Sequence, residues 1–289
     1  MKFSMKLNLM QLAALVCLAA SPALAQLQKV VLNDRYYLID MPDRPSGTII
    51  LALHNATGDP EEFRDKSQLS PAAQKKGYAV VYPEGLGKSW NGFYCCGYAQ
   101  EHQVDDLRFL DRVVADVAAR FGLDPTRVYV TGMGNGSVMA ETYAARRSTT
   151  VKAVAGVAGT LDLRRTPAAA VPLLHIQGLD DKVVPYGIRG AEYGAKHRTD
   201  AFTSTPDLIS AFVSAHGQLT QTTRAIDTRP DGTSVIQDDF DDARGVTRVR
   251  LLTIKGGGHV WPAEFRKGEG NTRDISATTE ILRFFDKHP

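Results

Sequence analysis

The sequence predicts an α/β fold: one mostly parallel, doubly wound sheet with helices on both faces and a short antiparallel hairpin at the N-terminus. Three observations support this prediction. Short apolar runs rich in β-branched residues recur along the chain, segments with helical periodicity separate most of them, and no repeat or low-complexity linker divides the chain. We therefore expect a single domain over residues 26–289.

Residues 1–25 are predicted to be a signal peptide rather than part of that fold. Two lysines precede the apolar stretch "LNLMQLAALVCLAA", and "ALA" at 23–25 is typical of a cleavage site. Ser21 and Pro22 interrupt the apolar run before it reaches the roughly 20 residues that a membrane span needs. The sequence thus predicts a secreted or periplasmic protein, cleaved near Ala25, with no stable membrane anchor.

Charge and cysteine content narrow the possible partners. The whole chain has 34 basic and 32 acidic residues. Both lysines of the leader are lost on cleavage, so the formal net charge falls from +2 to 0. With no polybasic run, nucleic acid and anionic membrane surfaces are not expected partners. Cys95 and Cys96 are the only cysteines outside the leader; they form either a vicinal disulfide or two thiols. Their spacing does not suit a metal, and no metal or cofactor is predicted.

The expected strands follow in chain order. The hairpin consists of "VVL" (30–32) and "YYLI" (36–39), and the later strands are expected at 47–54, 77–83, 127–132, 151–159, 171–176 and 249–256. The clearest helix spans about 105–121, where apolar residues recur every three or four positions behind acidic ones. Further helices are expected near 66–76, 137–147, 206–216 and 275–287.

Four polar or glycine-rich segments come at the ends of expected strands: "LHNATGD" (53–59), "TGMGNGS" (131–137), "GLDDKVVPYG" (178–187) and "GGGHVWP" (256–262). In a doubly wound sheet, ligands and catalytic groups collect where loops leave the carboxyl ends of the strands. We therefore expect these four segments to converge on one site.

The segment "VYVTGMGNGS" has two interpretations. Gly132, Gly134 and Ser137 nearly match the G-x-G-x-x-G/A fingerprint that binds a dinucleotide pyrophosphate. Three or more strands precede it, however, and the next strand lacks the acidic residue that would hold a ribose, so nucleotide binding is the remote alternative. The other interpretation is a nucleophile elbow, G-x-S-x-G, in which Gly134 stands at the serine position and Gly136 at the last glycine.

Seven segments in order decide between these interpretations: "LHNATGDPEEF", "GYAVVYPEGLGKSWNGFYCCG", "VDDLRFL", "DPTRVYVTGMGNG", "VAGT", "HIQGLDDKVVPYG" and "GGGHVWPA". Over roughly 45–289 the chain resembles the secreted polyhydroxybutyrate depolymerase and feruloyl esterase group, relatives of carbohydrate esterase family 1. The resemblance implies an α/β-hydrolase fold and a Ser-Asp-His triad that cleaves carboxylic esters through an acyl-enzyme. It also implies a polyester or a feruloylated or acetylated polysaccharide as the ester partner.

The resemblance assigns the catalytic roles residue by residue. His259 aligns with the general base, and Asp181 with the acid that orients its imidazole. Asp180 is the rival acid, but the register of "DKVVPY" favours its neighbour. Gly134 occupies the place of the nucleophile and has no hydroxyl.

An oxyanion hole is expected from two backbone N–H groups, those of Asn135 and Ala56. The family reads His-Gly where this chain has Asn55 after the histidine; asparagine tolerates left-handed backbone angles, so the loop is compatible with that change. Trp90 and Trp261 flank these loops and are expected either to line an acyl or aromatic pocket or to pack in the interior.

The expected function is that of a secreted carboxylic-ester hydrolase whose catalysis is impaired because Gly134 replaces the nucleophile. An alternative route uses water activated by His259, or Ser137 as nucleophile. A further alternative is a non-catalytic protein that binds esters or glycans, or an interaction module. His54 and His175 are expected to be structural.

Overall fold

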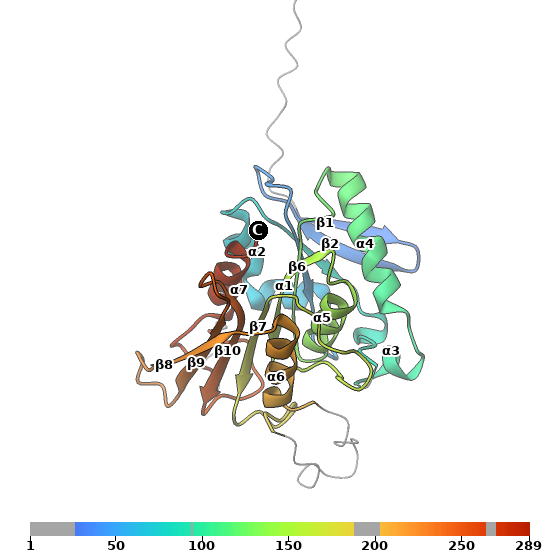
Figure 1. Ribbon diagram of the computed structural model, residues 1–289. Coiled ribbons are helices and arrows are strands. Elements are labelled where there is room, and N and C mark those ends of the chain that lie inside the picture. Colours follow the sequence, from blue (N-terminus) through green and yellow to red (C-terminus); the bar gives the residue numbers. More distant parts are fainter. Residues whose placement is uncertain (1–26, 94, 188–202, 264–269) are drawn as a thin grey trace, which may run out of the picture.

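The computed structural model describes residues 27–93, 95–187, 203–263 and 270–289. Ten strands form one sheet in the order β1-β2-β4-β3-β5-β6-β7-β10-β9-β8. Neighbours from β4 to β10 pair in parallel, and antiparallel strands flank them at both ends of the sheet (Figure 1). The strands are β1 (Leu27–Leu32), β2 (Arg35–Asp40), β3 (Ile49–Leu53), β4 (Ala79–Pro83), β5 (Val128–Met133), β6 (Val151–Val157), β7 (Leu173–Gly178), β8 (Thr220–Ile226), β9 (Ser234–Asp241) and β10 (Thr247–Lys255). The signal peptide predicted at 1–25 lies outside the described residues.

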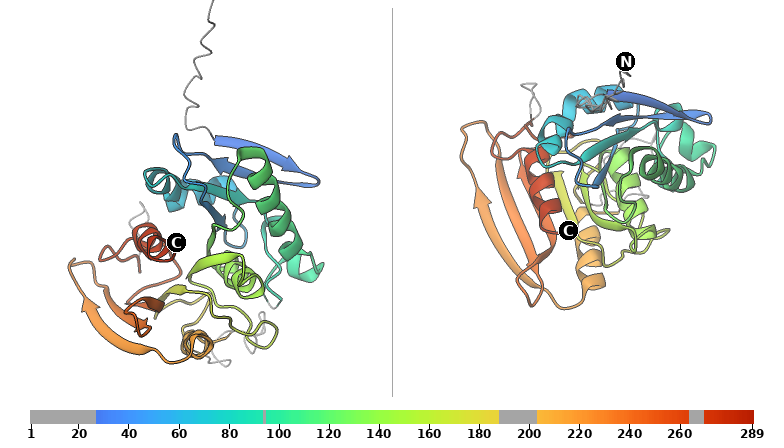
Figure 2. Two further views of the ribbon diagram at one scale, coloured as in Figure 1. Left: turned by 45° about the horizontal axis from the view of Figure 1, so that its top comes forward. Right: turned by 90° about the horizontal axis from the view of Figure 1, so that it is seen from above.

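Helices cover both faces of this sheet, as the sequence predicts (Figure 2). The core on one face takes residues from α4 (Asp106–Phe121), α5 (Asn135–Arg146) and α6 (Thr205–His216). The core on the other face takes residues from α1 (Pro60–Ser67), α2 (Leu69–Gln74) and α7 (Ala277–Asp286). Two short elements, η1 (Leu86–Lys88) and α3 (Tyr98–Glu101), lie between β4 and α4. The mostly parallel sheet with its N-terminal hairpin is confirmed.

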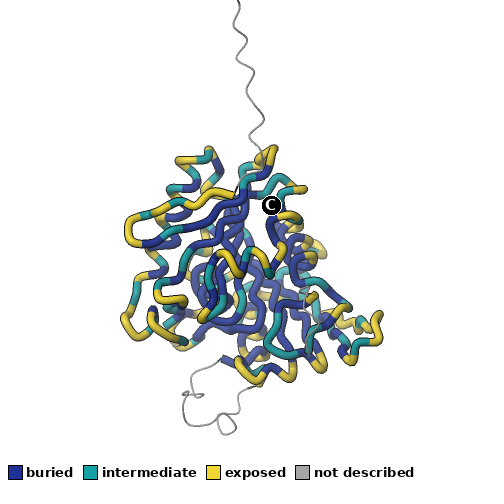
Figure 3. Tube along the Cα trace, turned by 180° about the vertical axis from the view of Figure 1, so that it is seen from behind, coloured by how far each residue is buried: buried dark blue, intermediate teal, exposed yellow. Residues whose placement is uncertain are grey.

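The central strands are buried on both faces, which explains why they read as continuous apolar runs. All residues of β3, β4 and β7 are buried. Figure 3 shows the buried part of the chain in dark blue in the interior of the molecule. Because parallel strands end at the same edge, the loops that follow β3, β5, β7 and β10 are brought together there.

The structure corrects the single helix expected near 66–76. It contains two short helices instead, because α1 begins earlier, at Pro60, behind an N-cap formed by Asp59, whose side chain accepts from the N–H of Glu62. Gln68 then adopts the left-handed conformation, with φ 51°, and separates α1 from α2.

Strands β8 and β9 were not expected from the sequence. The residues of β8, "TQTTRAI", are almost all exposed, and β9 has only alternate residues buried, so neither contains an apolar run. They extend the sheet as an antiparallel ribbon beyond β10. Among the described residues, the helices are too short or too polar to cross a bilayer.

Candidate active site

The turn between β5 and α5 has the geometry of a nucleophile elbow. Gly134 is the only residue between the two elements and has φ 54° and ψ −121°. Side chains rarely adopt this conformation, which glycine reaches freely. A Cβ atom on Gly134 would lie 3.1 Å from Nε2 of His259 and 3.5 Å from Cβ of Asn55. Position 134 therefore faces the histidine, although it has no side chain to present.

Gly136 brings the elbow against the end of β3. A Cβ atom here would lie 2.2 Å from the carbonyl oxygen of Leu53 and 2.4 Å from that of His54. Any larger residue would push α5 away from the loop that follows β3. The bare glycine thus sets the distance between the elbow and the second segment expected to bind an oxyanion.

Asp181 and His259 form the hydrogen-bonded pair that the sequence predicts to act on the nucleophile. Nδ1 of His259 lies 2.9 Å from Oδ2 of Asp181. The carboxylate is 3% exposed, and its other oxygen accepts from the backbone N–H groups of Val183 and Val184, at 2.8 and 2.9 Å. Since a carboxylate only accepts, Nδ1 carries a proton and donates it to Asp181, and Nε2 is the ring nitrogen that faces the elbow. The rival Asp180 is exposed.

Strand register explains why these two residues meet. Strands β7 and β10 are parallel neighbours, with Gly178 paired to Ile254 at their carboxyl ends. The loops beyond them stay together because Asp180 donates its N–H to the carbonyl of Gly257, at 2.9 Å. Gln177 adds a side-chain hydrogen bond of 3.0 Å to Oδ2 of Asp181, which fixes the carboxylate. The acid and base loops are therefore held as one unit.

The two predicted oxyanion donors are available. In the part of the chain that the structure describes, the backbone N–H groups of Asn135 and Ala56 donate to no protein acceptor. The loop containing Ala56 is fixed on both sides: Thr57 donates its N–H to Lys88, and Gly58 donates to Asn55. Two uncommitted amides at the start of a helix and in a constrained loop suit a developing negative charge.

His54 supports this loop, in keeping with the structural role expected for it. It is 1% exposed. Its Nε2 accepts the backbone N–H of Gly85 at 2.9 Å, so Nδ1 carries the proton and donates to the carbonyl of Asn55. Burial lowers the pKa of His54, which keeps the ring neutral and suited to accept at Nε2.

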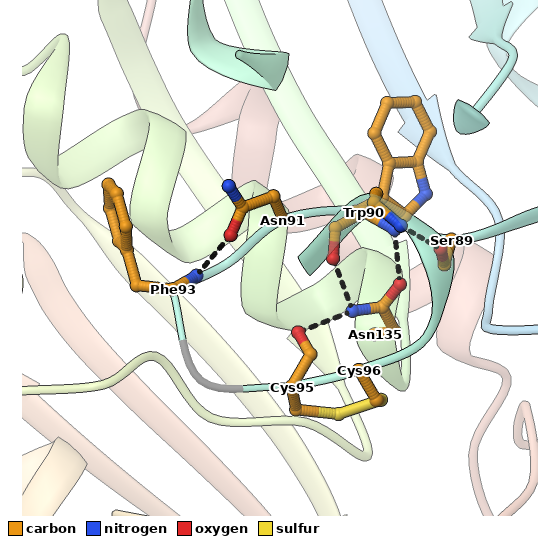
Figure 4. The surroundings of a disulfide bond; sticks show 8 residues. Ser89, Trp90, Asn91, Phe93, Cys95, Cys96 and Asn135 are labelled. Atoms are coloured by element: carbon orange, nitrogen blue, oxygen red, sulfur yellow. Dashed lines mark hydrogen bonds between the residues drawn. A yellow bond between two sulfur atoms is a disulfide. The ribbon is translucent and has the colours of Figure 1, made fainter. Parts of the chain in front are cut away.

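The side chain of Asn135 anchors a third loop to the elbow (Figure 4). Its Oδ1 accepts from the N–H of Trp90 at 2.6 Å, and its Nδ2 donates to the carbonyls of Trp90 and Cys95, both at 2.9 Å. The indole N–H of Trp90 in turn donates to the carbonyl of His54 at 2.9 Å. One asparagine thus links both oxyanion segments, a role that its position in the sequence did not reveal.

Both tryptophans are turned into the protein. Trp90 is 0% and Trp261 2% exposed. The indole N–H of Trp261 donates to Oγ1 of Thr278, and its ring packs edge-on against Phe63. Of the two expectations for these rings, the structure therefore shows interior packing, because each indole finds its hydrogen-bond partner inside.

The remaining candidates have structural positions. Cys95 and Cys96, for which the sequence left two states open, are joined by a vicinal disulfide (Figure 4). Ser137 is buried and donates to the carbonyl of Gly159 at 2.7 Å, away from His259. His175 is buried against a carboxylate of α5. The described residues contain no group of three or more histidine, cysteine, aspartate or glutamate side chains placed to hold a metal ion.

Sheet order, elbow and the Asp–His pair at the carboxyl edge are those of an α/β-hydrolase, and solved structures agree. The acetyl xylan esterase from Aspergillus awamori superposes with a TM-score of 0.61 at 14% identity, covering 91% of this chain and 99% of that one. Crystal structures of the esterase PE8 and of TT1662 from Thermus thermophilus give TM-scores of 0.53 and 0.52. At these low sequence identities, the similarity shows a shared fold and no more.

The family follows from the sequence comparisons. Residues 37–174 match the family described as Esterase PHB depolymerase. The putative esterase NocK of Nocardia uniformis subsp. tsuyamanensis is 30% identical over 76% of this chain and 67% of its own length. The chain belongs to the Esterase PHB depolymerase family, which confirms the resemblance inferred from its motifs.

Two further relatives are longer proteins. Feruloyl esterase B of Piromyces equi is 23% identical over 73% of this chain, and poly(3-hydroxyalkanoate) depolymerase C of Paucimonas lemoignei is 23% identical over 81%. The matches span 39% and 59% of those proteins.

Proposed function

We propose that this protein binds carboxylic esters at the elbow but cannot form the acyl-enzyme at position 134. The observation that carries the proposal is the elbow itself: Gly134 keeps the nucleophile's backbone conformation opposite Nε2 of His259 and lacks the hydroxyl that would react. Removing the nucleophile of a well-studied serine protease lowers kcat by about 10⁶. We therefore expect hydrolysis far below the rate of an intact triad.

The groups that remain support binding. The ester carbonyl oxygen would accept from the free N–H groups of Asn135 and Ala56. The alcohol oxygen of the ester would face His259, whose ring Asp181 holds in place. These groups would position an ester for attack, and the step that is missing is the covalent one.

The substrate class and location are part of the same proposal. The names of the relatives, a feruloyl esterase and a poly(3-hydroxyalkanoate) depolymerase, favour a feruloylated polysaccharide or a polyester as the ligand, and the resemblance of the motifs adds an acetylated polysaccharide. The leader-like residues 1–25 favour export to the periplasm or medium, without a membrane anchor.

A second candidate is slow hydrolysis by water. Nε2 of His259 faces the space that a serine side chain would fill, so a water molecule there could be activated directly. Ser137 is disfavoured as a replacement nucleophile because its hydroxyl donates to the carbonyl of Gly159.

The test is Gly134→Ser, assayed with p-nitrophenyl acetate and methyl ferulate. Esterase activity should rise by several orders of magnitude, and adding His259→Ala should abolish the gain. Gly134→Ala is the matched control, since it adds the same Cβ atom without the hydroxyl. A Gly134→Ser protein that folds but remains as inactive as Gly134→Ala would refute the proposal that only the nucleophile is missing.

Turnover by the unmodified protein separates the two candidates. The first candidate, a protein that binds esters without forming an acyl-enzyme, predicts no turnover above background. If the protein hydrolyses p-nitrophenyl acetate at a rate that disappears in His259→Ala and persists in Ser137→Ala, the water route is supported instead. Activity at the rate of an intact triad would contradict both.

A further inference from the structure

A hollow lies between the loop that contains Asn91 and Phe93 and the segment that contains Arg165. Its volume is about 450 Å³, which lies within the range of small-molecule sites. Amide, charged and aromatic side chains line it, among them Asn91, Phe93, Gln100, Gln103, Asp105 and Arg165. None of the residues of the elbow or of the Asp–His pair lines it.

Two of the segments that line the hollow also contact the elbow. Asn91 and Phe93 belong to the loop that Asn135 anchors (Figure 4). Arg165 belongs to the segment that leaves β6, and this segment passes the elbow at Gly159, where a Cβ atom would lie 2.1 Å from the carbonyl oxygen of Gly134. Phe93 and Arg165 also contact Arg146, the last residue of α5, so the hollow lies along this helix and not at the elbow itself.

The lining offers uncommitted hydrogen-bonding groups. Within the described ranges, the side-chain amides of Gln100 and Gln103 and the guanidinium of Arg165 bond to no protein group. Carboxamides donate and accept, as sugar hydroxyls do, so each can bond a hydroxyl in either sense. The acidic Asp106 at the base is already neutralised by Arg35, at 2.7 Å.

Phe93 supplies an apolar wall. It is partly exposed and has φ 76°, a conformation that a bulky residue adopts only when its surroundings impose it. The N–H of Phe93 donates to Oδ1 of Asn91 at 3.1 Å, and the guanidinium of Arg146 lies 5.2 Å from its ring centroid. The loop thus holds the ring at the hollow instead of letting it turn into the core.

We propose that this hollow binds a neutral oligosaccharide. The C–H face of one sugar ring would pack on Phe93, while its hydroxyls bond Gln100, Gln103 and Arg165. The lining contains Asp105 as well as Arg165, so its formal charges balance, which favours a neutral ligand over a polyanion. Binding here needs neither an ester nor a nucleophile, so it goes beyond the function proposed for the elbow.

The experiment titrates the purified, unmodified protein with xylotetraose or cellotetraose by calorimetry and by amide NMR. A small, solvent-exposed site predicts a dissociation constant of roughly millimolar order. The side-chain amide signals of Gln100 and Gln103 should shift. Phe93→Ala should weaken binding at least about fivefold, because it removes the aromatic contact. Arg165→Ala should also weaken it, whereas Arg244→Ala, on an exposed turn far along the chain, should leave it unchanged.

Gln103→Gly keeps the test decisive if Phe93→Ala does not fold. Gln103 is exposed and has φ 52°, which glycine accepts, so the variant removes the side chain with its carboxamide without straining the backbone. Three results would overturn the proposal: no binding of either oligosaccharide at millimolar concentration, binding unaffected by Gln103→Gly and Arg165→Ala, or tighter binding of tetragalacturonate, which would indicate an anion site. Because no ester is present, the outcome is independent of turnover at the elbow.

Discussion

Replacing Asn135 by alanine should destabilise the protein by about 3 kcal/mol. Its side chain is 4% exposed and makes three hydrogen bonds to backbone groups of Trp90 and Cys95. Alanine would remove three hydrogen bonds, at about 1 kcal/mol each. It would leave the N–H of Trp90 and the carbonyl of Cys95 without a partner, whereas the carbonyl of Trp90 would keep the N–H of Gly92. Asn135→Asp should cost more, since it would place a carboxylate against the two carbonyl oxygens.

Urea unfolding followed by tryptophan fluorescence measures this loss, because Trp90 is one of two tryptophans and lies at the affected contact. Gln221→Ala is the control: it removes one hydrogen bond on the exposed strand β8 and should change stability by less than about 0.5 kcal/mol. A loss below about 1 kcal/mol for Asn135→Ala would refute the view that this side chain holds the loops together.

Three other outcomes are expected. Arg35→Met should lower the free energy of unfolding, measured by denaturation, by about 3–5 kcal/mol because it leaves Asp106 charged and buried. The double variant Arg35→Met with Asp106→Leu should recover much of that loss. Asp59→Ala should lower the free energy of unfolding by about 1 kcal/mol at neutral pH. The N–H of Glu62 lowers the pKa of Asp59 in the folded state, so the stabilisation by this carboxylate is lost as the pH falls through that pKa. In strong acid, the variant and the unmodified protein should therefore be equally stable. Mass spectrometry after alkylation without reductant should find no free thiol in the processed chain and one in a chain that keeps its leader.

The Asp–His pair was assigned from the resemblance of its two motifs to a known family, and the topology explains why the two residues meet. Asp181 and His259 each follow a buried parallel strand, and β7 and β10 prove to be neighbours. The glycines of "TGMGNGS" alone also fitted a dinucleotide loop, and the other motifs along the chain favoured the elbow; in the structure, Gly134 and Gly136 lie where the tight strand-to-helix turn needs small residues. The candidate site could therefore be predicted from the order of these motifs along the chain.

Contacts that depend on long-range packing could not be predicted from the sequence. The bonds between Asn135 and Trp90 join residues 45 positions apart, and no local pattern shows which way either side chain turns. An indole beside a catalytic motif suits a pocket wall or a core equally well. Strand β8 was not predicted for a different reason. Its residues are exposed and mostly polar, and they form a strand because they pair with the edge of β9.

Gly134 differs from a serine at the same place in two ways. It removes the reacting hydroxyl, and it also removes the strain of a side chain at φ 54° and ψ −121°, which is of order 1–3 kcal/mol. A Cβ atom would also press on His259 from 3.1 Å, so the imidazole must retreat by a few tenths of an ångström to admit it. The hydrogen bond to Asp181 and the free amides around the elbow therefore persist at lower conformational cost without the nucleophile than with it. A site kept in this form is better suited to holding an ester than to cleaving it, and restoring serine should raise activity while lowering stability.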